Sequence, residues 1–298
     1  MFTFNLRNTF LFAAAILLTS TLQLACNSND EVLLNTNLGT TCIENFQEGI
    51  DYFPEKASIN HAQNFSIEYH NYFKVIRIPE GTKSVYVLVQ CGAPKPLLTG
   101  LLANAEIIQI PVKTIFTSST AQIPALVDVE RVEVLTGHAQ TSLVVSPPIV
   151  KRINEGKIES FAENYEIDIE TVIASNPKVL LSGGFEDPAY PAIRDAGITV
   201  VDYPDWLEKT PLARAEWPKI VAALLNKEGI AEENFAKIEK QYNDIKAQTG
   251  NIPEQEKPTI TTGLLYGDIF YAAGGSSYVA FLIRDAGGRY VWEANNNT

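Results

Sequence analysis

The chain has 298 residues, of which 46% are hydrophobic and 19% are charged. This composition is sufficient to bury a core and carries too few charges for a disordered chain. The formal net charge is -12 and the lysines and arginines do not cluster, so the phosphate backbone of a nucleic acid would be repelled overall. We therefore expect no nucleic acid partner.

The first residues have the pattern of an export signal. Arg7 precedes an uncharged apolar run over residues 10–18. That run is shorter than the roughly 20 residues that a helix needs to cross a bilayer, so it indicates a signal peptide and not a membrane span. We expect the signal peptide to occupy residues 1–25.

The end of this signal predicts a lipid anchor. Ala25 before Cys26 resembles the cleavage site of a bacterial lipoprotein, at which the cysteine is acylated, although Gln23 stands where leucine is usual. We therefore predict a periplasmic or extracytoplasmic protein, lipid-anchored to the membrane through Cys26. Plain secretion is the alternative. Residues 26–41 are polar and lack a sustained period, which is typical of a flexible tether.

Two cysteines remain after Cys26, namely Cys42 and Cys91. In an oxidising compartment two cysteines most often form one disulfide, and this pairing is our prediction. Two buried thiols are the alternative. The bond would join the start of the folded chain to the end of a strand.

Residues 42–104 read as a β-rich N-terminal extension. The stretches 65–69 and 73–78 both alternate apolar and polar residues, and His70-Asn71 between them suits a tight reversal, so we predict a hairpin. Residues 85–89 form a nearly continuous apolar strand that ends near Cys91.

Residues 105–209 alternate short apolar strands with helical stretches, the pattern of an α/β lobe with a parallel sheet. Ligands of such sheets bind beyond the carboxyl ends of the strands, which here are 117–120, 136–140 and 182–187. The predicted strands are 107–111, 114–117, 132–135, 179–181 and 199–201, and the predicted helices are 120–127, 148–154, 169–175 and 189–196.

A helix is predicted over residues 210–228, because Thr210-Pro211 is a good start signal and apolar residues continue at helical spacing. Pro218 would kink it unless a helix begins there, and Gly229 is expected to break it. A second amphipathic helix follows, and a partial second α/β lobe completes residues 229–298, with a strand at 259–265, a helix near 277–286 and a strand at 290–292.

Several short segments, in order, carry a resemblance to a known family. The chain resembles the solute-binding proteins of iron-siderophore and cobalamin ABC importers. The N-terminal hairpin together with residues 86–92 resembles an extension found in a branch that binds ferric chelates. The segments are residues 113–120, 154–158, 168–170, 176–181, 214–217 and 274–278.

The resemblance implies an α/β fold of two Rossmann-like lobes joined by a single long helix. The family's second lobe is longer, so we expect this chain to hold only part of it. The implied activity is binding and not turnover: a membrane-tethered receptor, expected to be a monomer, captures an iron chelate or siderophore between the lobes and delivers it to an ABC permease. Cobalamin or haem is the alternative ligand within the class.

The family docks on its permease through exposed glutamates, and Glu170 lies at the position of the first one. An ordinary solvated residue near a helix start is the alternative for Glu170. Arg214 could pair with an anionic chelate, or with Glu216 or Asp205. The candidate ligand-binding residues offer hydroxyls, aromatic rings and flexible loops: Ser118, Ser119, Thr120, Gly183, Gly184, Glu186, Tyr266, Asp268, Tyr271, Ser276, Ser277 and Tyr278.

No resident metal or cofactor is expected. The chain has three histidines, without helical pairing, and no cysteine pair with zinc spacing, so iron should arrive already chelated. An exported hydrolase is a weaker alternative because the sequence lacks a Gly-x-Ser-x-Gly elbow, a P-loop and a dinucleotide fingerprint. His138 could act as a base in such an enzyme, but a hydrogen-bonded structural histidine is the preferred interpretation. A surface adhesion module is a third class.

Overall fold

A computed structural model describes residues 34–79 and 85–296. The predicted signal peptide and the predicted lipidation at Cys26 lie outside these residues. Within them, none of the helices combines the length and the apolar character that crossing a bilayer would demand.

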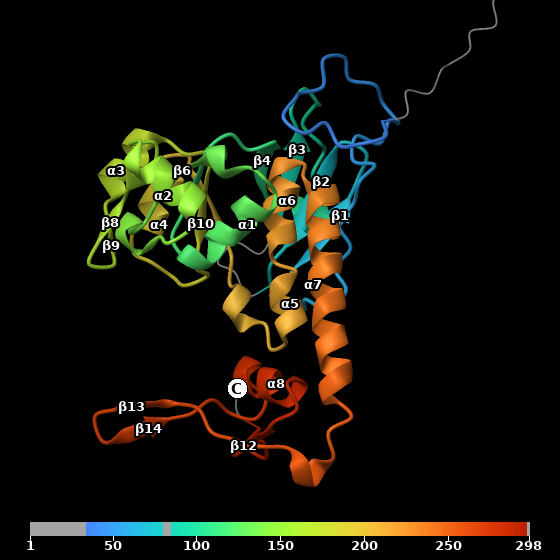
Figure 1. Ribbon diagram of the computed structural model, residues 1–298. Helices are drawn as coiled ribbons and strands as arrows, with labels where there is room; N and C mark the ends of the chain where they lie inside the picture. Colours follow the sequence, from blue (N-terminus) through green and yellow to red (C-terminus); the bar gives the residue numbers. More distant parts are fainter. Residues whose placement is uncertain (1–33, 80–84, 297–298) are drawn as a thin grey trace, which may run out of the picture. The chain divides into compact units, whose positions relative to one another are not determined.

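The N-terminal extension forms a four-stranded sheet with the order β1-β2-β3-β4 (Figure 1). The predicted hairpin is confirmed: β1 and β2 pair antiparallel, with Tyr69 opposite Lys74. β3 pairs antiparallel with β2 and parallel with β4. The strands are β1 (Ser66–Tyr69), β2 (Phe73–Arg77), β3 (Val85–Gln90) and β4 (Glu106–Ile110).

The position of β4 differs from the prediction, which counts it as the first strand of the α/β lobe. Its residues pair with β3 throughout, so it completes the N-terminal sheet. The reason is in the burial pattern of β3, which is covered along nearly its whole length. Such a strand needs partners on both edges, because unpaired backbone groups are costly when they are buried.

A disulfide joins Cys42 to Cys91, as predicted, with 4.8 Å between the two Cα atoms. The neighbouring backbone reinforces this junction, because the amide of Ile43 donates to the carbonyl oxygen of Cys91 at 2.8 Å. The approach is so close that a Cβ on Gly92 would lie 2.0 Å from the carbonyl oxygen of Ile43, and Gly92 also has a φ of +87°. Only glycine fits this position.

A second, five-stranded sheet has the order β11-β10-β5-β6-β7, and every neighbouring pair is parallel. The predicted strands at 114–117, 179–181 and 199–201 are confirmed, each within one residue. The strands are β5 (Ile115–Thr117), β6 (Leu135–His138), β7 (Glu159–Ser160), β10 (Val179–Ser182) and β11 (Thr199–Asp202).

The helices between these strands also agree with the prediction. Helix α3 has the predicted bounds, and the side chain of Asp168 caps it by accepting from the amide of Thr171 at 3.0 Å. The helices are α1 (Ile123–Asp128), α2 (Pro147–Asn154), α3 (Ile169–Ser175) and α4 (Tyr190–Asp195). A parallel sheet with such crossovers is the predicted α/β fold.

The predicted strand at 132–135 is wrong. Residues Val132–Val134 form a 3-10 turn, and β6 starts only at Leu135 and runs through Gly137 to His138. Packing decides the register, because a Cβ on Gly137 would lie about 2.4 Å from the ring of Phe116. The glycine that weakens a strand in sequence terms is therefore what lets β6 lie beside β5.

Residues 210–228 form two helices in place of the one predicted. Thr210 caps α5 (Pro211–Ala215), and Pro218 is the first residue of α6 (Pro218–Leu225), so the proline starts a helix and does not kink one. Asn226, in the left-handed conformation, ends α6. The 22-residue helix α7 (Glu228–Thr249) then begins. Gly229 lies in its first turn and does not end a helix, contrary to the prediction.

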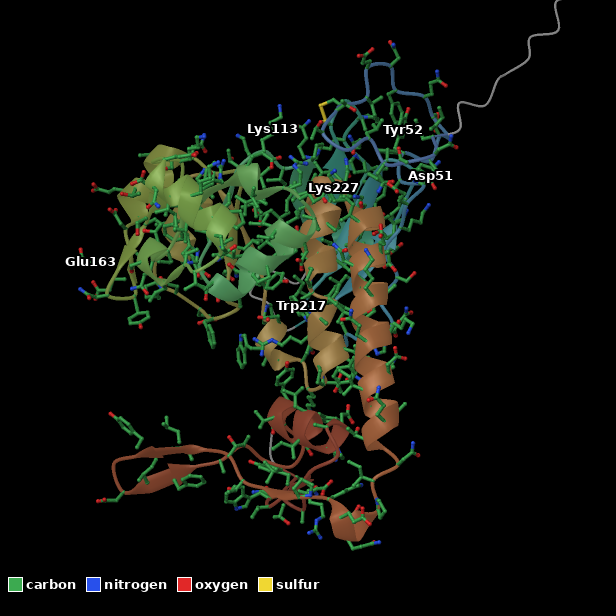
Figure 2. All side chains as sticks on the ribbon, viewed as in Figure 1. Asp51, Tyr52, Lys113, Glu163, Trp217 and Lys227 are labelled. Carbon is green, nitrogen blue, oxygen red and sulfur yellow. A yellow bond between two sulfur atoms is a disulfide. The ribbon has the colours of Figure 1, made fainter. Side chains whose placement is uncertain are left out.

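Helix α6 lies at the centre of the largest core cluster, and each of its residues from Lys219 to Leu225 is buried. Just before it lies Trp217 (Figure 2). Its side chain is fully buried and packs against Phe65, at 4.9 Å between ring centroids, and against Tyr203, at 5.0 Å. The same cluster contains residues of both sheets. The N-terminal sheet and the α/β sheet therefore share one core.

A buried ion pair fixes the N-terminal sheet to α7. Lys74 on β2 pairs with Glu228, and both side chains have 0% exposure. The ammonium of Lys74 also donates to the carbonyl of Ala223 and to the side chain of Asn226, each at 2.9 Å. Asn37 donates to the second carboxylate oxygen of Glu228 at 2.8 Å. Each charge is thus hydrogen-bonded on several sides, which a buried pair needs.

Two further carboxylates hold the segment before β1. Glu216 accepts from the amides of Asn60, His61 and Ala62 at 2.7 to 3.0 Å. Glu208 accepts from the amide of Asn64 at 2.9 Å. Together with Glu228, these residues form what we call the carboxylate clasp: Glu208, Glu216 and Glu228.

The last described residues form small elements. The predicted strand at 259–265 is interrupted by residues 261–263, and a Cβ added to Gly263 would lie 2.4 Å from the carbonyl oxygen of Tyr271. The predicted helix near 277–286 is confirmed as α8. The elements are β12 (Thr259–Ile260), β13 (Leu264–Tyr266), β14 (Ile269–Tyr271), α8 (Tyr278–Asp285) and β15 (Arg289–Tyr290).

Candidate functional site

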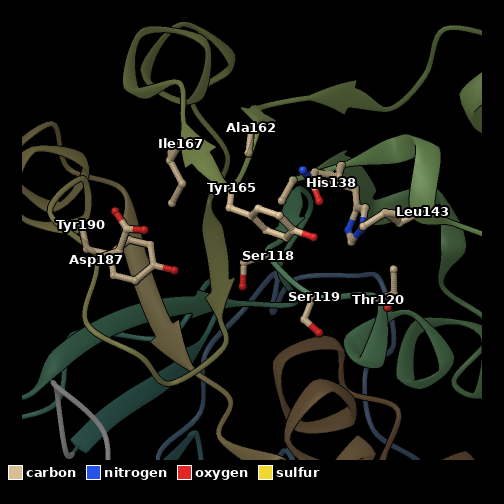
Figure 3. A pocket seen from close by; sticks show the side chains of 12 residues that line it. Ser118, Ser119, Thr120, His138, Leu143, Ala162, Tyr165, Ile167, Asp187 and Tyr190 are labelled. Carbon is tan, nitrogen blue, oxygen red and sulfur yellow. The ribbon is translucent and has the colours of Figure 1, made fainter. Parts of the chain in front are cut away.

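A hollow of about 310 Å³ opens at the carboxyl ends of the parallel strands (Figure 3). It is lined by the loops that follow β5 and β6, by the hairpin of β8 (Ala162–Glu163) and β9 (Glu166–Ile167), and by the residues before α4. The lining residues are Ser118, Ser119, Thr120, His138, Ala139, Gln140, Leu143, Ala162, Tyr165, Ile167, Asp187 and Tyr190.

The strand order explains why the hollow lies there. From β5 the chain proceeds outward to β6 and β7 on one side, and it returns to β10 and β11 on the other. The connections therefore diverge between β5 and β10, and this switch point is where open α/β sheets hold ligands. The three predicted segments at 117–120, 136–140 and 182–187 all contribute residues to the lining.

Hydrogen bonds fix the serine-rich loop after β5. The amide of Ser118 donates to the carbonyl of Leu181 at 3.0 Å, and the side chain of Gln122 donates to the carbonyl of Ser182 at 2.8 Å. Ser119 and Gln122 form a capping box at the start of the 3-10 turn that precedes α1. The loop is therefore tied to β10, and its hydroxyls are presented from a fixed backbone.

His138 ends β6 and is 1% exposed. Its Nδ1 lies 2.8 Å from the hydroxyl oxygen of Thr117. Burial lowers the pKa of His138 below its ordinary value, and hydrogen bonding to Thr117 opposes this only in part. The ring is therefore a neutral, hydrogen-bonded group at physiological pH, in agreement with the preferred structural interpretation of this histidine.

Tyr190 is the first residue of α4 and lines the hollow together with Asp187. Asp187 fixes the loop before this helix. The side chain of Asp187 accepts from the amide of Ala189 at 2.8 Å. Burial raises the pKa of Tyr190 to about 12, helped by the negative charge of Asp187 and opposed by a hydrogen bond with Ser118. Tyr190 is thus a neutral phenol linked to the serine loop.

Tyr165 lies at the tip of the β8–β9 hairpin and is 84% exposed. Its φ is +67° and that of Asn164 is +50°. Asparagine tolerates the left-handed region, but a bulky aromatic residue there is uncommon, and glycine is the usual choice at this turn position. In Figure 3 the side chain of Tyr165 reaches in toward Ser118 and His138. The costly backbone conformation therefore places an aromatic ring over the hollow.

Among the predicted ligand residues, Ser118, Ser119 and Thr120 line the hollow. Gly183 lies beside it, since a Cβ there would be 4.0 Å from the hydroxyl of Ser118. The other two residues of that loop do not line it. Gly184, at a φ of +76°, packs against Pro204, and Glu186 lines a neighbouring shallow hollow with Arg194.

The six predicted residues of the C-terminal segment do not line this hollow. Tyr266 and Tyr271 are exposed on β13 and β14, with Asp268 in the turn between them. Ser277 caps α8 by accepting from the amide of Ala280 at 3.2 Å. The remaining two are Ser276, just before that cap, and Tyr278, at the start of α8.

Two charged candidates have clear surroundings. Arg214 pairs with Asp205 at 2.9 Å, one of the two predicted carboxylate partners, and its guanidinium lies 5.4 Å from the ring centroid of Tyr278. Glu216 is occupied instead in the carboxylate clasp. Glu170 is exposed in the first turn of α3.

Several residues that line the hollow are not among the predicted ligand residues. Asp187 and Tyr190 stand before and at the start of a predicted helix, which is a usable signal. Tyr165 belongs to a hairpin with strands of two residues, too short to show alternation. The lining residues outside the three predicted segments are Leu143, Ala162, Tyr165, Ile167 and Tyr190, whereas Ala139, Gln140 and Asp187 lie within those segments without having been named as ligand residues.

A bare metal ion finds no ready ligand set in the described part of the chain, because no three side chains of His, Cys, Asp or Glu come together there. The hollow instead combines hydroxyls, amide groups, two phenols and apolar side chains. Such a lining suits an organic ligand, whose orientation is set by a few polar groups.

Comparison with protein families identifies the class of protein to which this chain belongs. The family model described as periplasmic binding protein matches residues 120–298, more than half of the chain and most of the lining of the hollow. The chain belongs to the periplasmic binding protein family. Its members are binding proteins and not enzymes, which agrees with the expected activity.

Two curated relatives of this periplasmic binding protein are lipoproteins of Methanocaldococcus jannaschii. Uncharacterized lipoprotein MJ0878 is 32% identical over 153 residues, and uncharacterized lipoprotein MJ0872 is 21% identical over 245 residues. The alignments cover 50% and 80% of this chain, and 36% and 62% of the relatives. The chain thus spans less than two thirds of either relative.

A solved structure supports the fold. A possible iron-binding (periplasmic solute-binding) protein from Staphylococcus epidermidis matches with a TM-score of 0.52 and 14% identity, covering 62% of this chain and 69% of the other. At this identity the match shows the α/β fold alone.

The buried His138 predicts a pH dependence of stability. Because its folded-state pKa lies below the unfolded value of about 6.5, the unfolded chain binds a proton first as the pH falls. The free energy of unfolding should therefore decrease below about pH 6.5, with no contribution from this group above it. Denaturant unfolding at several pH values should show a smaller decrease for His138→Asn, whose side chain can still bond to Thr117. Equal slopes for both proteins would contradict the prediction.

Proposed function

We propose that this periplasmic binding protein captures an iron(III) chelate in the hollow at the switch point and delivers it to an ABC permease. The alternative within the class is cobalamin or haem. The observation that supports this proposal is the lining of the hollow, where hydroxyl groups and phenols gather at the carboxyl ends of the parallel strands. Among the described residues, no group of side chains could bind a bare metal ion. Iron bound there would bring its own organic ligands. The similarity to the S. epidermidis protein, which is named a possible iron-binding protein, is consistent with this proposal.

The proposal includes the delivery apparatus. Lipidation of Cys26 would hold the protein at the membrane, and Glu170 would meet an arginine of the permease. Glu170 is exposed on the helix that follows the β8–β9 hairpin, so it is accessible for docking. Residues 229–298 would supply part of a second lobe, with Tyr266, Asp268, Tyr271, Ser276, Ser277 and Tyr278 on the far side of the ligand.

The first experiment is a titration of the mature chain with ferric siderophores, ferric citrate, haem and cobalamin, followed by tyrosine and tryptophan fluorescence. We expect saturable quenching by a ferric chelate. The variant Ser118→Trp places an indole in the hollow and should therefore lose this saturable quenching. As a control, Thr249→Trp at the end of α7 should keep it. Saturation by haem or cobalamin alone would select the alternative, and binding unaffected by Ser118→Trp would locate the site elsewhere.

Tyr165 provides a test with opposite effects on stability and binding. Tyr165→Gly relieves a left-handed conformation that costs on the order of 1 kcal/mol or more, so denaturant unfolding should show a higher free energy of unfolding. The same change removes the ring over the hollow and should weaken chelate binding by about tenfold, the value of about 1.4 kcal/mol of lost contact.

Asn164→Gly is the matched control for Tyr165→Gly. It changes the other left-handed residue of the same turn but leaves the ring in place. We expect unchanged chelate affinity. A Tyr165→Gly variant that binds as tightly as the wild type would show that the ring does not contact the ligand.

A further inference from the structure

The charges around the hollow are unsuited to an anionic ligand. Asp187 contributes a carboxylate, and no lysine or arginine is among the described residues that line it. In the neighbouring shallow hollow, Glu186 and Arg194 have opposite charges. The guanidinium carbon of Arg194 lies 5.8 Å from the ring centroid of Tyr190, a residue that lines both hollows. The balance of charge at the hollow is therefore negative.

The neutral groups do not reverse this balance. His138 is buried, and burial lowers its pKa, so the imidazole carries no charge at physiological pH. Backbone amides often bind anions at a helix start, and several of those beside the hollow already have partners within the chain. The amide of Ala121 donates to Ser119 and the amide of Ser119 to Gln122, each at 3.2 Å, and the amide of Ala189 donates to Asp187.

We propose that the hollow selects its ligand by charge, accepting neutral or cationic ferric chelates and discriminating against anionic ones. This inference rests on the proposed function. The fitting class is iron wrapped by three hydroxamates, whose metal centre is neutral and whose arms can carry an ammonium group. Ferric tricatecholates and ferric citrate, which are anionic, would meet the carboxylate of Asp187.

A matched series of ligands isolates charge from shape. A linear ferric trihydroxamate with a terminal amine can be used as the ammonium form, as the neutral N-acetyl form and as the anionic N-succinyl form. We expect the succinyl form to bind about tenfold more weakly than the ammonium form at low salt, which is the effect of one partly exposed charge contact. The difference should shrink in roughly 0.5 M salt, because ions screen such a contact.

The variant Asp187→Asn tests the assigned residue. Asparagine keeps the oxygen that accepts from Ala189, so the loop should persist while the charge is lost. We expect the affinity ratio of the ammonium and succinyl forms to fall to about one third or less of its wild-type value. Asp195→Asn is the matched control, because Asp195 is exposed at the end of α4, the helix that follows Asp187, and does not line the hollow; this variant should leave the ratio unchanged.

The outcomes separate the two proposals. Equal affinities of the three forms, a reversed order, or an equal response to Asp187→Asn and Asp195→Asn would overturn selection by charge while leaving chelate binding intact. Saturation by ferric citrate or a ferric tricatecholate with no binding of the series would do the same. If no ferric chelate of any charge binds the folded protein, both proposals fail.

Discussion

Lys74→Met should destabilise the protein by about 3 to 5 kcal/mol, because it leaves Glu228 as a buried carboxylate without its partner. The ammonium of Lys74 holds together β2, the end of α6 and the start of α7 through Glu228, Asn226 and Ala223. Its loss also removes a cation that lies 4.3 Å from the ring centroid of Phe53. Urea unfolding followed by far-UV circular dichroism measures the change.

An exposed ion pair provides the control for Lys74→Met. Lys56 pairs with Asp51, and the two side chains are 42% and 44% exposed. Lys56→Met should cost less than about 1 kcal/mol, since such pairs contribute little in water. The double variant Lys74→Met with Glu228→Gln should recover part of the loss, because it removes the unpaired charge. A Lys74→Met variant as stable as Lys56→Met would show that the buried pair does not hold the sheet to the helices.

Removal of the disulfide should cost about 4 kcal/mol. Cys42 and Cys91 are 49 residues apart, and closing a loop of that length restricts the unfolded chain by roughly this amount. Replacing both cysteines by alanine should therefore shift guanidinium unfolding to a clearly lower midpoint. The wild type in the presence of a reductant should approach the variant.

The reductant also supplies the control. It should leave the double alanine variant unchanged, because that protein has no bond to break among its described residues. Identical midpoints for the oxidised wild type and the double variant would contradict the prediction. A midpoint shift in the variant caused by the reductant would point to an effect other than the disulfide.

Local patterns were sufficient for much of the α/β sheet. The strands at Ile115, Val179 and Thr199 are continuous apolar runs bounded by polar turns, so their positions follow from the sequence. The strand at Leu135 does not follow, because the fit of Gly137 against Phe116 decides its register. The pairing of β4 with β3 likewise depends on which edge of a buried strand needs a partner, and no local pattern contains that information.

The site was predictable in location and only in part in composition. Topology places it at the carboxyl edge of the sheet, and the serine-rich loop after β5 belongs to it. Tyr165 escapes prediction because an aromatic residue in a left-handed turn opposes the usual rule for hairpins. The clasp residue Glu216 escapes because its partners, the amides of residues 60–62, lie about 155 residues earlier. Local preference cannot report such distant contacts.

The sequence separation of these contacts determines the order in which they can form after synthesis begins. Lys74 can form its ion pair only after Glu228 has been synthesised, 154 residues later, and Asn37 can bond to the same carboxylate only 191 residues after it. At about 5 to 20 residues per second of synthesis, the side of the N-terminal sheet that α6 covers stays bare for roughly 8 to 30 s. Cys42 and Cys91 are only 49 residues apart. In the oxidising compartment where we expect the bond, the two cysteines can therefore pair without any contribution from the helices that complete the core.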